Sequence, residues 1–213
     1  MTNTKRETPP RDRRGTEQTI VEAAKQVLAE EGFSAFGINA IARRAGCDKQ
    51  LIYRYFGGIE GLVEAIGKEL SDLYAKLLAE PDPRSCDTYQ TFVEHFMLAL
   101  IEAMRSSDLL LRIAAWEVLD PSPMTRTLAE ARGQALSEWI RQRRGALVVP
   151  EHVDAGALNA TLIAAVQHLA LSARAVGSFG GVRLASDADW ERIRRSISVL
   201  VQAAYGSKAD GHT

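Results

Sequence analysis

Apolar residues recur every three or four positions along most of the chain, which is the spacing of one face of an α-helix. Ile20, Ala24 and Leu28 form the first such stripe, between a candidate cap at Thr16 and a helix stop at Gly32. No run of alternating β-branched residues is long enough to predict a strand. The pattern therefore predicts an all-α protein.

Residues 38–62 predict two short helices joined by a tight turn. Gly46 stands where helices commonly end in a left-handed residue. Asp48 follows as a candidate cap for the second helix, whose Ile52 and Phe56 are four residues apart and should face inward. This order of elements is typical of a helix-turn-helix unit.

The chain beyond Ile59 continues as longer helices. An apolar stripe over residues 62–77 predicts a long connecting helix, which ends near residues 81–83 because their two prolines cannot continue it. Further helices are predicted at about residues 88–105, 108–119, 123–144, 153–176 and 189–204.

These patterns divide the chain into three regions. Residues 1–14 are polar and interrupted by proline, so we predict a disordered basic arm, with a solubilising tail as the alternative. Residues 15–58 are predicted to form a three-helix, helix-turn-helix domain. Residues 59–213 are predicted to form a larger helical domain for ligand binding and dimerisation.

The second short helix presents side chains suited to DNA on its outer face. They combine a cation, an amide, two phenols, an apolar group and a guanidinium that can grip guanine in bidentate fashion. The set is Lys49, Gln50, Leu51, Tyr53, Arg54 and Tyr55.

An ordered series of residues at fixed spacing surrounds this face. It consists of Gly32-Phe33, Ile41-Ala42, Ala45-Gly46, Asp48, Ile52-Tyr53, Tyr55-Phe56, Gly57, Glu60 and Leu62. With these motifs, the segment from about residue 16 to residue 62 resembles the DNA-binding half of TetR-family transcriptional repressors. The resemblance implies a homodimer formed through the last two helices, a palindromic double-stranded operator, and release by a small-molecule ligand.

One position departs from the family pattern. The family usually places a lysine at the start of the next helix, where it holds a phosphate, and this chain has Ile59 there. We expect the remaining phosphate contacts to come from three places. These are the basic arm, the start of the first short helix, and three side chains of the second short helix. These residues are Arg11, Arg13, Arg14, Gly37, Ile38, Asn39, Lys49, Tyr53 and Tyr55. Gln50, Leu51 and Arg54 are then the candidates for reading bases.

Charge is distributed unevenly between the predicted domains. The formal net charge of −1 would not by itself indicate a nucleic-acid partner. Residues 1–58, however, contain ten Lys or Arg and seven Asp or Glu, whereas residues 59–213 contain sixteen and twenty. The excess of positive charge lies on the segment that should meet phosphate.

The middle helices, over about residues 88–144, carry aromatic and thioether side chains that could enclose a largely apolar ligand. The candidates are Phe92, His95, Phe96, Met104, Trp116 and Trp139. The alternative is that these residues are ordinary core, as aromatic stripes at helical spacing usually are.

Two long C-terminal helices are the candidates for dimerisation. Small side chains over residues 153–176 would let helix axes approach closely in a four-helix interface. This helix is apolar on most faces, so we expect burial on more than one side. Polar residues such as Asn159 and His168 interrupt it, and we therefore predict a buried helix without membrane insertion.

The sequence offers little for catalysis. Cys47 and Cys86 lack a metal or redox motif and are predicted to be free thiols in the cytoplasm. No nucleophile, carboxylate pair or glycine-rich loop accompanies His95 or His168, so we predict no catalytic residues, metal site or cofactor. The alternatives to a ligand-responsive repressor are a DNA-binding regulator without ligand response and an α-helical enzyme.

Overall fold

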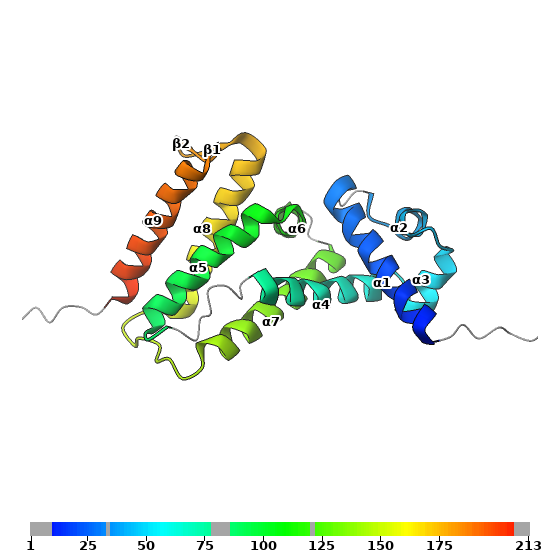
Figure 1. Cartoon of the computed structure of the whole chain (residues 1–213), viewed down its shortest axis with the longest axis horizontal. Coiled ribbons are helices and arrows are strands. Elements are labelled where there is room, and N and C mark those ends of the chain that lie inside the picture. The colour runs from blue at the N-terminus through cyan, green and yellow to red at the C-terminus, as the bar shows by residue number, and fades with distance from the viewer. Residues whose placement is uncertain (1–9, 33–34, 78–85, 120–121, 207–213) are drawn as a thin grey trace, which may run out of the picture. The chain divides into compact units, whose positions relative to one another are not determined.

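The computed structural model describes residues 10–32, 35–77, 86–119 and 122–206. These residues form nine α-helices, one π-helical turn and one two-stranded hairpin, which confirms the all-α class. They belong to two compact units (Figure 1). The first comprises residues 1–70 and 116–132, and the second comprises residues 71–115 and 133–213.

The elements follow the predicted order. They are α1 (Pro10–Gln26), the π-helical turn η1 (Val27–Glu31), α2 (Ile38–Ala45), α3 (Lys49–Phe56), α4 (Ile59–Leu77), α5 (Tyr89–Ser106), α6 (Asp108–Leu119), α7 (Pro123–Arg144), α8 (Ala155–Val176), β1 (Ser178–Phe179), β2 (Val182–Arg183) and α9 (Asp187–Tyr205). The predicted helix end at residues 81–83 lies outside the described residues.

Helix α1 begins earlier than the cap expected at Thr16. Its first residue is Pro10, whose fixed φ angle suits the start of a helix. Arg13 pairs with Glu17 one turn later, at 2.9 Å. Helix α1 therefore includes residues 10–14 of the predicted basic arm, while residues 1–9 lie outside the described residues.

The first unit is closed by the π-helical turn after α1. Gly32 ends this turn at φ 79°, as the predicted helix stop required. Glu30 and Glu31 of the turn bind the Arg44 guanidinium of α2 at 2.6 and 2.7 Å. These hydrogen bonds raise the pKa of Arg44. The turn thus fixes α2 against the end of α1.

The first unit also extends past the predicted boundary at residue 59. Leu62, Val63 and Ile66 of α4 are buried in it. A Cβ atom added to Gly67 would lie 2.7 Å from the Cβ of Ala131, so this glycine permits the close approach of α4 and α7. Helices α4, α6 and α7 each contribute residues to both units.

The second unit is built around α5, which contacts both α8 and α9 (Figure 1). A polar junction joins the three helices. Asn159 of α8 donates to the Tyr89 hydroxyl of α5 at 2.9 Å and accepts from the Tyr205 hydroxyl of α9 at 2.8 Å. Burial, with smaller effects of Tyr89 and Asp154, raises the pKa of Tyr205 to about 12.

Helix α8 is not buried on more than one side, so that prediction is wrong for the single chain. Leu162, Val166 and Ala170 are its buried residues. Its opposite face is mostly exposed, although the His168 ring on that face packs edge-to-face on Phe179 of the following hairpin at 4.6 Å. The exposed positions include Gly156, Ala157, Ala160, Thr161, Ala164 and His168. Among the described helices, α8 is the one that is long and apolar enough to cross a membrane, with 17% of its apolar window buried.

A short hairpin between α8 and α9 is a feature that the hydrophobic pattern missed. Ser178 pairs with Arg183 and Phe179 with Val182 in antiparallel register. The turn residues Gly180 and Gly181 have φ angles of 56° and 79°. Two positive φ angles are what a tight hairpin turn requires, so the Gly-Gly pair was the available signal.

Candidate nucleic-acid interface

The turn between α2 and α3 is fixed by local hydrogen bonds and by a small core. Gly46 is left-handed at φ 63°, and its backbone N–H donates to the carbonyl oxygens of Ala42 and Arg43. The Cys47 N–H donates to Ala42 at 3.0 Å. Burial, together with the charge of Asp48, raises the pKa of the Cys47 thiol, which keeps it protonated.

Helix α3 is capped as its sequence predicts. The Asp48 carboxylate accepts from the Gln50 N–H at 2.8 Å, and Gly57 closes the other end at φ 75°. Ile52 is fully buried and Phe56 is half-buried, so both predicted inward positions face the unit. The rotation of α3 about its axis is therefore set.

The opposite side of α3 is the face predicted to meet DNA. Lys49, Gln50, Tyr53 and Arg54 are exposed, and the exposed fraction of Tyr53 is 55%. A phenol this open on a helix with an anchored inner side is available to a partner.

Leu51 and Tyr55 of the same predicted set are half-buried. Tyr55 is the centre of a cationic cluster: the Arg54 guanidinium lies 4.7 Å from its ring centroid and donates to its hydroxyl at 2.6 Å. Arg13 of α1 lies 5.6 Å from the same ring. Arg54, a candidate for reading bases, is thus stacked on Tyr55. Arg13, which belongs to the predicted basic arm, lies beside the same ring.

The start of α2 leaves backbone donors open. Gly37 is the N-cap residue and makes no side-chain cap hydrogen bond. Gly37 and Ile38 are half-buried and Asn39 is exposed. Uncapped N–H groups at a helix start favour an anion, and phosphate is the contact predicted for these three residues.

Glycines shape the connection from α3 to α4, where the family lysine is replaced by Ile59. Gly58 has φ 136°, and a Cβ atom added to it would lie 3.8 Å from the Cε1 atom of the Tyr53 ring. A Cβ on Gly61 would lie 2.0 Å from the Phe56 carbonyl oxygen. Gly61 was not predicted as a special position, although a glycine inside a helical pattern is a signal of close packing. Ile59 itself is half-buried as the first residue of α4.

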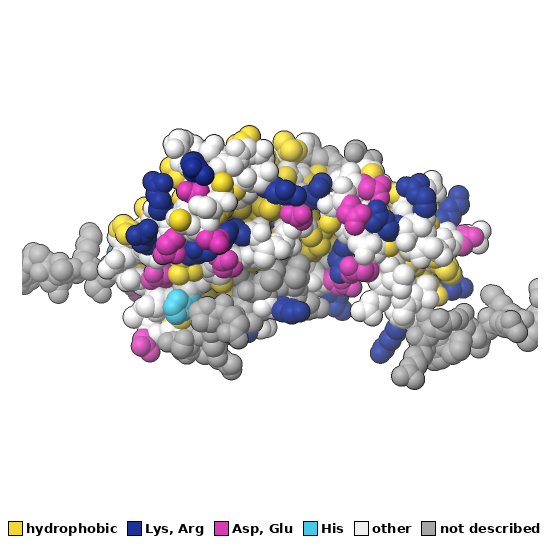
Figure 2. Space-filling model, turned by 45° about the horizontal axis from the view of Figure 1, so that its top comes forward, with side chains coloured by type: hydrophobic (Ala, Val, Ile, Leu, Met, Phe, Trp, Pro, Cys, Tyr) yellow, Lys and Arg dark blue, Asp and Glu magenta, His cyan; other side chains and the backbone are white. Residues whose placement is uncertain are grey.

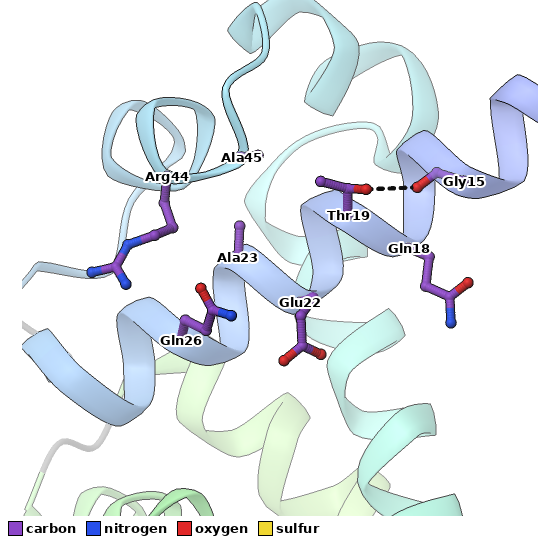
Figure 3. A pocket seen from close by; sticks show the side chains of 8 residues that line it. All are labelled: Gly15, Gln18, Thr19, Glu22, Ala23, Gln26, Arg44 and Ala45. Carbon is purple, nitrogen blue, oxygen red and sulfur yellow. Dashed lines mark hydrogen bonds between the residues drawn. The ribbon is translucent and has the colours of Figure 1, made fainter.

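A polar groove of about 370 Å³ lies between α1 and α2 (Figure 3). It is lined by Gly15, Gln18, Thr19, Glu22, Ala23, Gln26, Arg44 and Ala45. None of these residues belongs to α3, and Arg44 is engaged by Glu30 and Glu31. The groove is therefore separate from the predicted DNA-contacting residues.

Much of the positive charge on the first unit is internally paired. Burial acts to lower the pKa of Lys25, but hydrogen bonds with Glu22 and Glu69 raise it overall. On the face drawn in Figure 2, dark blue and magenta side chains mostly lie beside one another. Lys49 and Arg54 of α3 are exposed and form no ion pair with the described residues.

The predicted ligand-binding residues do not all meet. Trp139 of α7 stacks on Phe92 at 6.5 Å between ring centroids and packs on Phe96 at 5.7 Å. The Trp139 Nε1 donor is buried and has no hydrogen-bond partner among the described residues. His95 Nδ1 lies 3.2 Å from the Cys86 sulfur. These groups belong to the second unit.

Two further predicted ligand residues lie elsewhere. Met104 is fully buried near the C-terminal end of α5. Trp116 of α6 belongs to the first unit, where it packs edge-to-face on Phe36 at 6.4 Å. Phe36 directly precedes the N-cap residue of α2, so Trp116 contacts the core of the first unit beside α2. Among the described residues, no three His, Cys, Asp or Glu side chains are grouped to hold a metal ion.

Comparisons with known proteins agree with this geometry. Residues 20–66 match the family model of bacterial regulatory proteins, tetR family. The chain is similar to the HTH-type transcriptional repressor SCO4008 of Streptomyces coelicolor, with 30% identity over 52% of this chain and 53% of that protein. It is similar to the HTH-type transcriptional regulator AlkX of Mycobacterium tuberculosis, with 25% identity over 57% of this chain and 63% of that protein.

The fold is shared over a longer span. The transcriptional regulator FadR from Bacillus subtilis, in complex with stearoyl-CoA, superposes with a TM-score of 0.61 at 16% identity, covering 86% of this chain and 96% of that chain. The chain spans 53% of the length of SCO4008 and 63% of the length of AlkX. The family match lies in the helix-turn-helix segment, over residues 20–66. The segment over residues 20–66 thus matches the tetR family of bacterial regulatory proteins, and the whole chain shares the fold of solved transcriptional regulators.

Proposed function

We propose that this protein is a dimeric transcriptional repressor that binds a palindromic double-stranded operator in the cytoplasm and leaves it when a small, largely apolar ligand binds. The observation that carries the proposal is α3: it is capped at both ends, anchored by Ile52 and exposed along Lys49, Gln50, Tyr53 and Arg54. Such a helix can enter a major groove as a rigid body.

The proposed DNA contacts fall into two groups. Lys49, Tyr53, Tyr55 and the amides at the start of α2 would hold phosphates and set the register. Gln50, Leu51 and Arg54 would contact base edges. Arg54 would first leave the Tyr55 ring, whose cation–π contact is worth about 0.5–1 kcal/mol at an exposed site. A bidentate contact with guanine, worth about 1–3 kcal/mol of discrimination, exceeds that cost.

The proposed dimer uses α8 and α9. The small residues Gly156, Ala157, Ala160 and Ala164, on the outer face of the first half of α8, would admit a second helix at close range. On α9, Val199 and Leu200 have exposed fractions of 64% and 54%. Together these faces supply the apolar surface that a four-helix interface needs.

The proposed ligand site is the aromatic cluster of Phe92, Phe96 and Trp139. The unpartnered Trp139 Nε1 supports it, because a buried donor without an acceptor costs about 1–3 kcal/mol and a ligand oxygen would remove that cost. The likeness to a fold that accommodates stearoyl-CoA in another protein also supports a ligand. Trp116 would have a coupling role in place of ligand contact, since α6 carries it against Phe36.

Selection of duplexes from a random pool by the full-length protein tests the DNA-binding proposal. We expect enrichment of two inverted half-sites, whose centres lie about 34–36 Å apart or a multiple of that. Absence of any enriched sequence would contradict the proposal.

A second candidate is a DNA-binding regulator without ligand response, favoured by the tight packing of Phe92 and Phe96. Thermal unfolding in the presence of a library of apolar small molecules separates the two. A stabilising compound that also weakens operator binding supports a sensor, whereas no stabilisation across the library supports the second candidate. An enzyme is disfavoured, since the family and both curated relatives are transcriptional regulators.

A further inference from the structure

A cleft of about 340 Å³ lies between α6 and α8, within the second unit and apart from the aromatic cluster. Its volume is at the lower end of the range of about 300–1,000 Å³ that small-molecule sites span. The lining residues are Asp108, Leu111, Arg112, Ala115, Leu171, Arg174 and Ala175. They recur at helical spacing, so each helix contributes one continuous face to the cleft.

The lining combines aliphatic and cationic groups. Leu111 is buried, and Leu171 and Ala115 are half-buried. Arg112 and Arg174 are exposed. A ligand in the cleft would therefore meet hydrocarbon on one side and guanidinium on the other.

The charges in the cleft do not balance. Arg174 is paired with Asp108, with two contacts of 3.3 and 3.4 Å. Arg112, one turn along α6 from Asp108, forms no ion pair or hydrogen bond with the described residues. The cleft thus contains two guanidinium groups and one carboxylate, which leaves the site with one uncompensated positive charge.

We propose that this cleft binds a small organic acid with a hydrocarbon body. The carboxylate would be held by Arg112, assisted by Arg174, because the planar guanidinium matches a carboxylate in bidentate fashion. The hydrocarbon would cover Leu111 and Leu171. An amine of the same length would meet repulsion from the same two arginines.

Such a ligand would act on the helix that enters the DNA-binding unit. The first turns of α6 line the cleft, and Trp116 of the same helix packs on Phe36. A bound acid therefore contacts an element that also contacts the core beside α2. Binding itself does not depend on the function proposed above, whereas its effect on DNA does.

Titration calorimetry of the full-length protein with decanoate and with decylammonium tests the proposal. We expect decanoate to bind at one site per chain and decylammonium not to bind. Arg112→Gln should weaken decanoate binding about five- to tenfold, the factor expected for one charge-assisted contact at an exposed site. Arg126→Gln is the matched control, because Arg126 is also exposed but lies in the first unit.

Several results would overturn the proposal. One is that decanoate binding cannot be detected. Another is that Arg112→Gln binds decanoate with the same affinity as the unsubstituted protein, and a third is that decylammonium binds as tightly as decanoate. A change in sedimentation of ligand-free Arg112→Gln would instead assign the cleft to a protein contact. Unchanged operator affinity at saturating decanoate would overturn the effect through α6, while sequence-selective DNA binding in the same assay would leave the repressor proposal standing.

Discussion

Helices α3 and α8 both bury one side and expose the other, but the exposed sides have opposite chemistry. The open side of α3 carries Lys49, Gln50, Tyr53 and Arg54, which are groups that hydrogen-bond in the presence of water. The open side of α8 carries alanines and Gly156, which offer close approach and little polarity. The first side suits a charged, hydrated polymer and the second suits another helix.

The two units also differ in how completely their polar groups are satisfied. In the first unit, Asp48 and Gly46 close the helix ends around the turn through local hydrogen bonds. In the second, Trp139 Nε1 is buried and has no hydrogen-bond partner in the part of the chain that the structure describes. If the first unit holds a fixed shape on DNA and the second responds to a ligand, we expect the polar groups of the first unit to be more completely hydrogen-bonded.

The largest effect is expected from Ala164→Trp on the exposed side of α8. The bulky ring would separate the two helices of the proposed interface, so we expect monomers and a loss of operator affinity of at least about a hundredfold. Sedimentation velocity and operator titration measure both. Ala146→Trp, in the exposed segment after α7, should leave both unchanged. A dimer that persists in Ala164→Trp would remove α8 from the interface.

Arg54→Ala tests the open side of α3. We expect it to reduce discrimination at one guanine by about 1–3 kcal/mol and to leave the dimer intact. Competition between the selected operator and its single-base variants measures this, with Arg126→Ala as the exposed control on α7. Unaltered selectivity would exclude Arg54 from base reading.

The matched pair Trp139→Phe and Trp190→Phe tests the difference inside the second unit. Both rings are buried and lie under an arginine, but Trp190 Nε1 donates to the Leu184 carbonyl at 3.1 Å. Trp139→Phe removes an unpartnered donor, whereas Trp190→Phe leaves an acceptor unpartnered. We expect Trp190→Phe to be more destabilising by about 1–2 kcal/mol in denaturant unfolding. Equal free energies of unfolding would mean that Trp139 Nε1 is satisfied in solution.

Arg13→Ala tests whether α1 supports α3 on DNA. If Arg13 reaches a phosphate from its position beside Tyr55, the slope of log affinity against log salt should fall by about one. Operator titrations across a salt series give the slope, and the sequence preference should not change. An identical slope would limit Arg13 to its pair with Glu17.

Tyr205→Phe is expected to have the smallest effect near neutral pH, about 1 kcal/mol from the lost hydrogen bond with Asn159. Because the pKa of Tyr205 is raised to about 12, its contribution to stability is complete below the ordinary tyrosine value near 10 and is lost as the pH rises toward 12. The variant should lack this alkaline loss. Parallel pH profiles of the free energy of unfolding for both proteins would contradict the assignment.

Local signals accounted for most element boundaries. Thr88 and Ser186 cap α5 and α9 through reciprocal hydrogen bonds, and Asp48 caps α3, so the sequence defined where these helices begin. The predicted cap at Thr16 is wrong, because α1 already begins at Pro10, a residue that is also compatible with a helix start.

The candidate sites were less accessible to sequence reasoning, because they depend on contacts between distant residues. The periodicity of α6 indicated that Trp116 is buried but could not tell which unit covers it. The apolar composition of α8 indicated burial without telling whether this chain or a second copy provides it. The stacking of Arg54 on Tyr55 likewise depends on side-chain conformation in the folded unit.

In the proposed dimer, two α3 helices are held at a fixed separation and read two half-sites together. Inserting about five base pairs, roughly half a helical turn, between the half-sites of the selected operator tests it most directly. We predict a loss of affinity of at least about a hundredfold, since the second α3 would then face the wrong side of the duplex. Equal affinity for the original and the lengthened operator would contradict the claim.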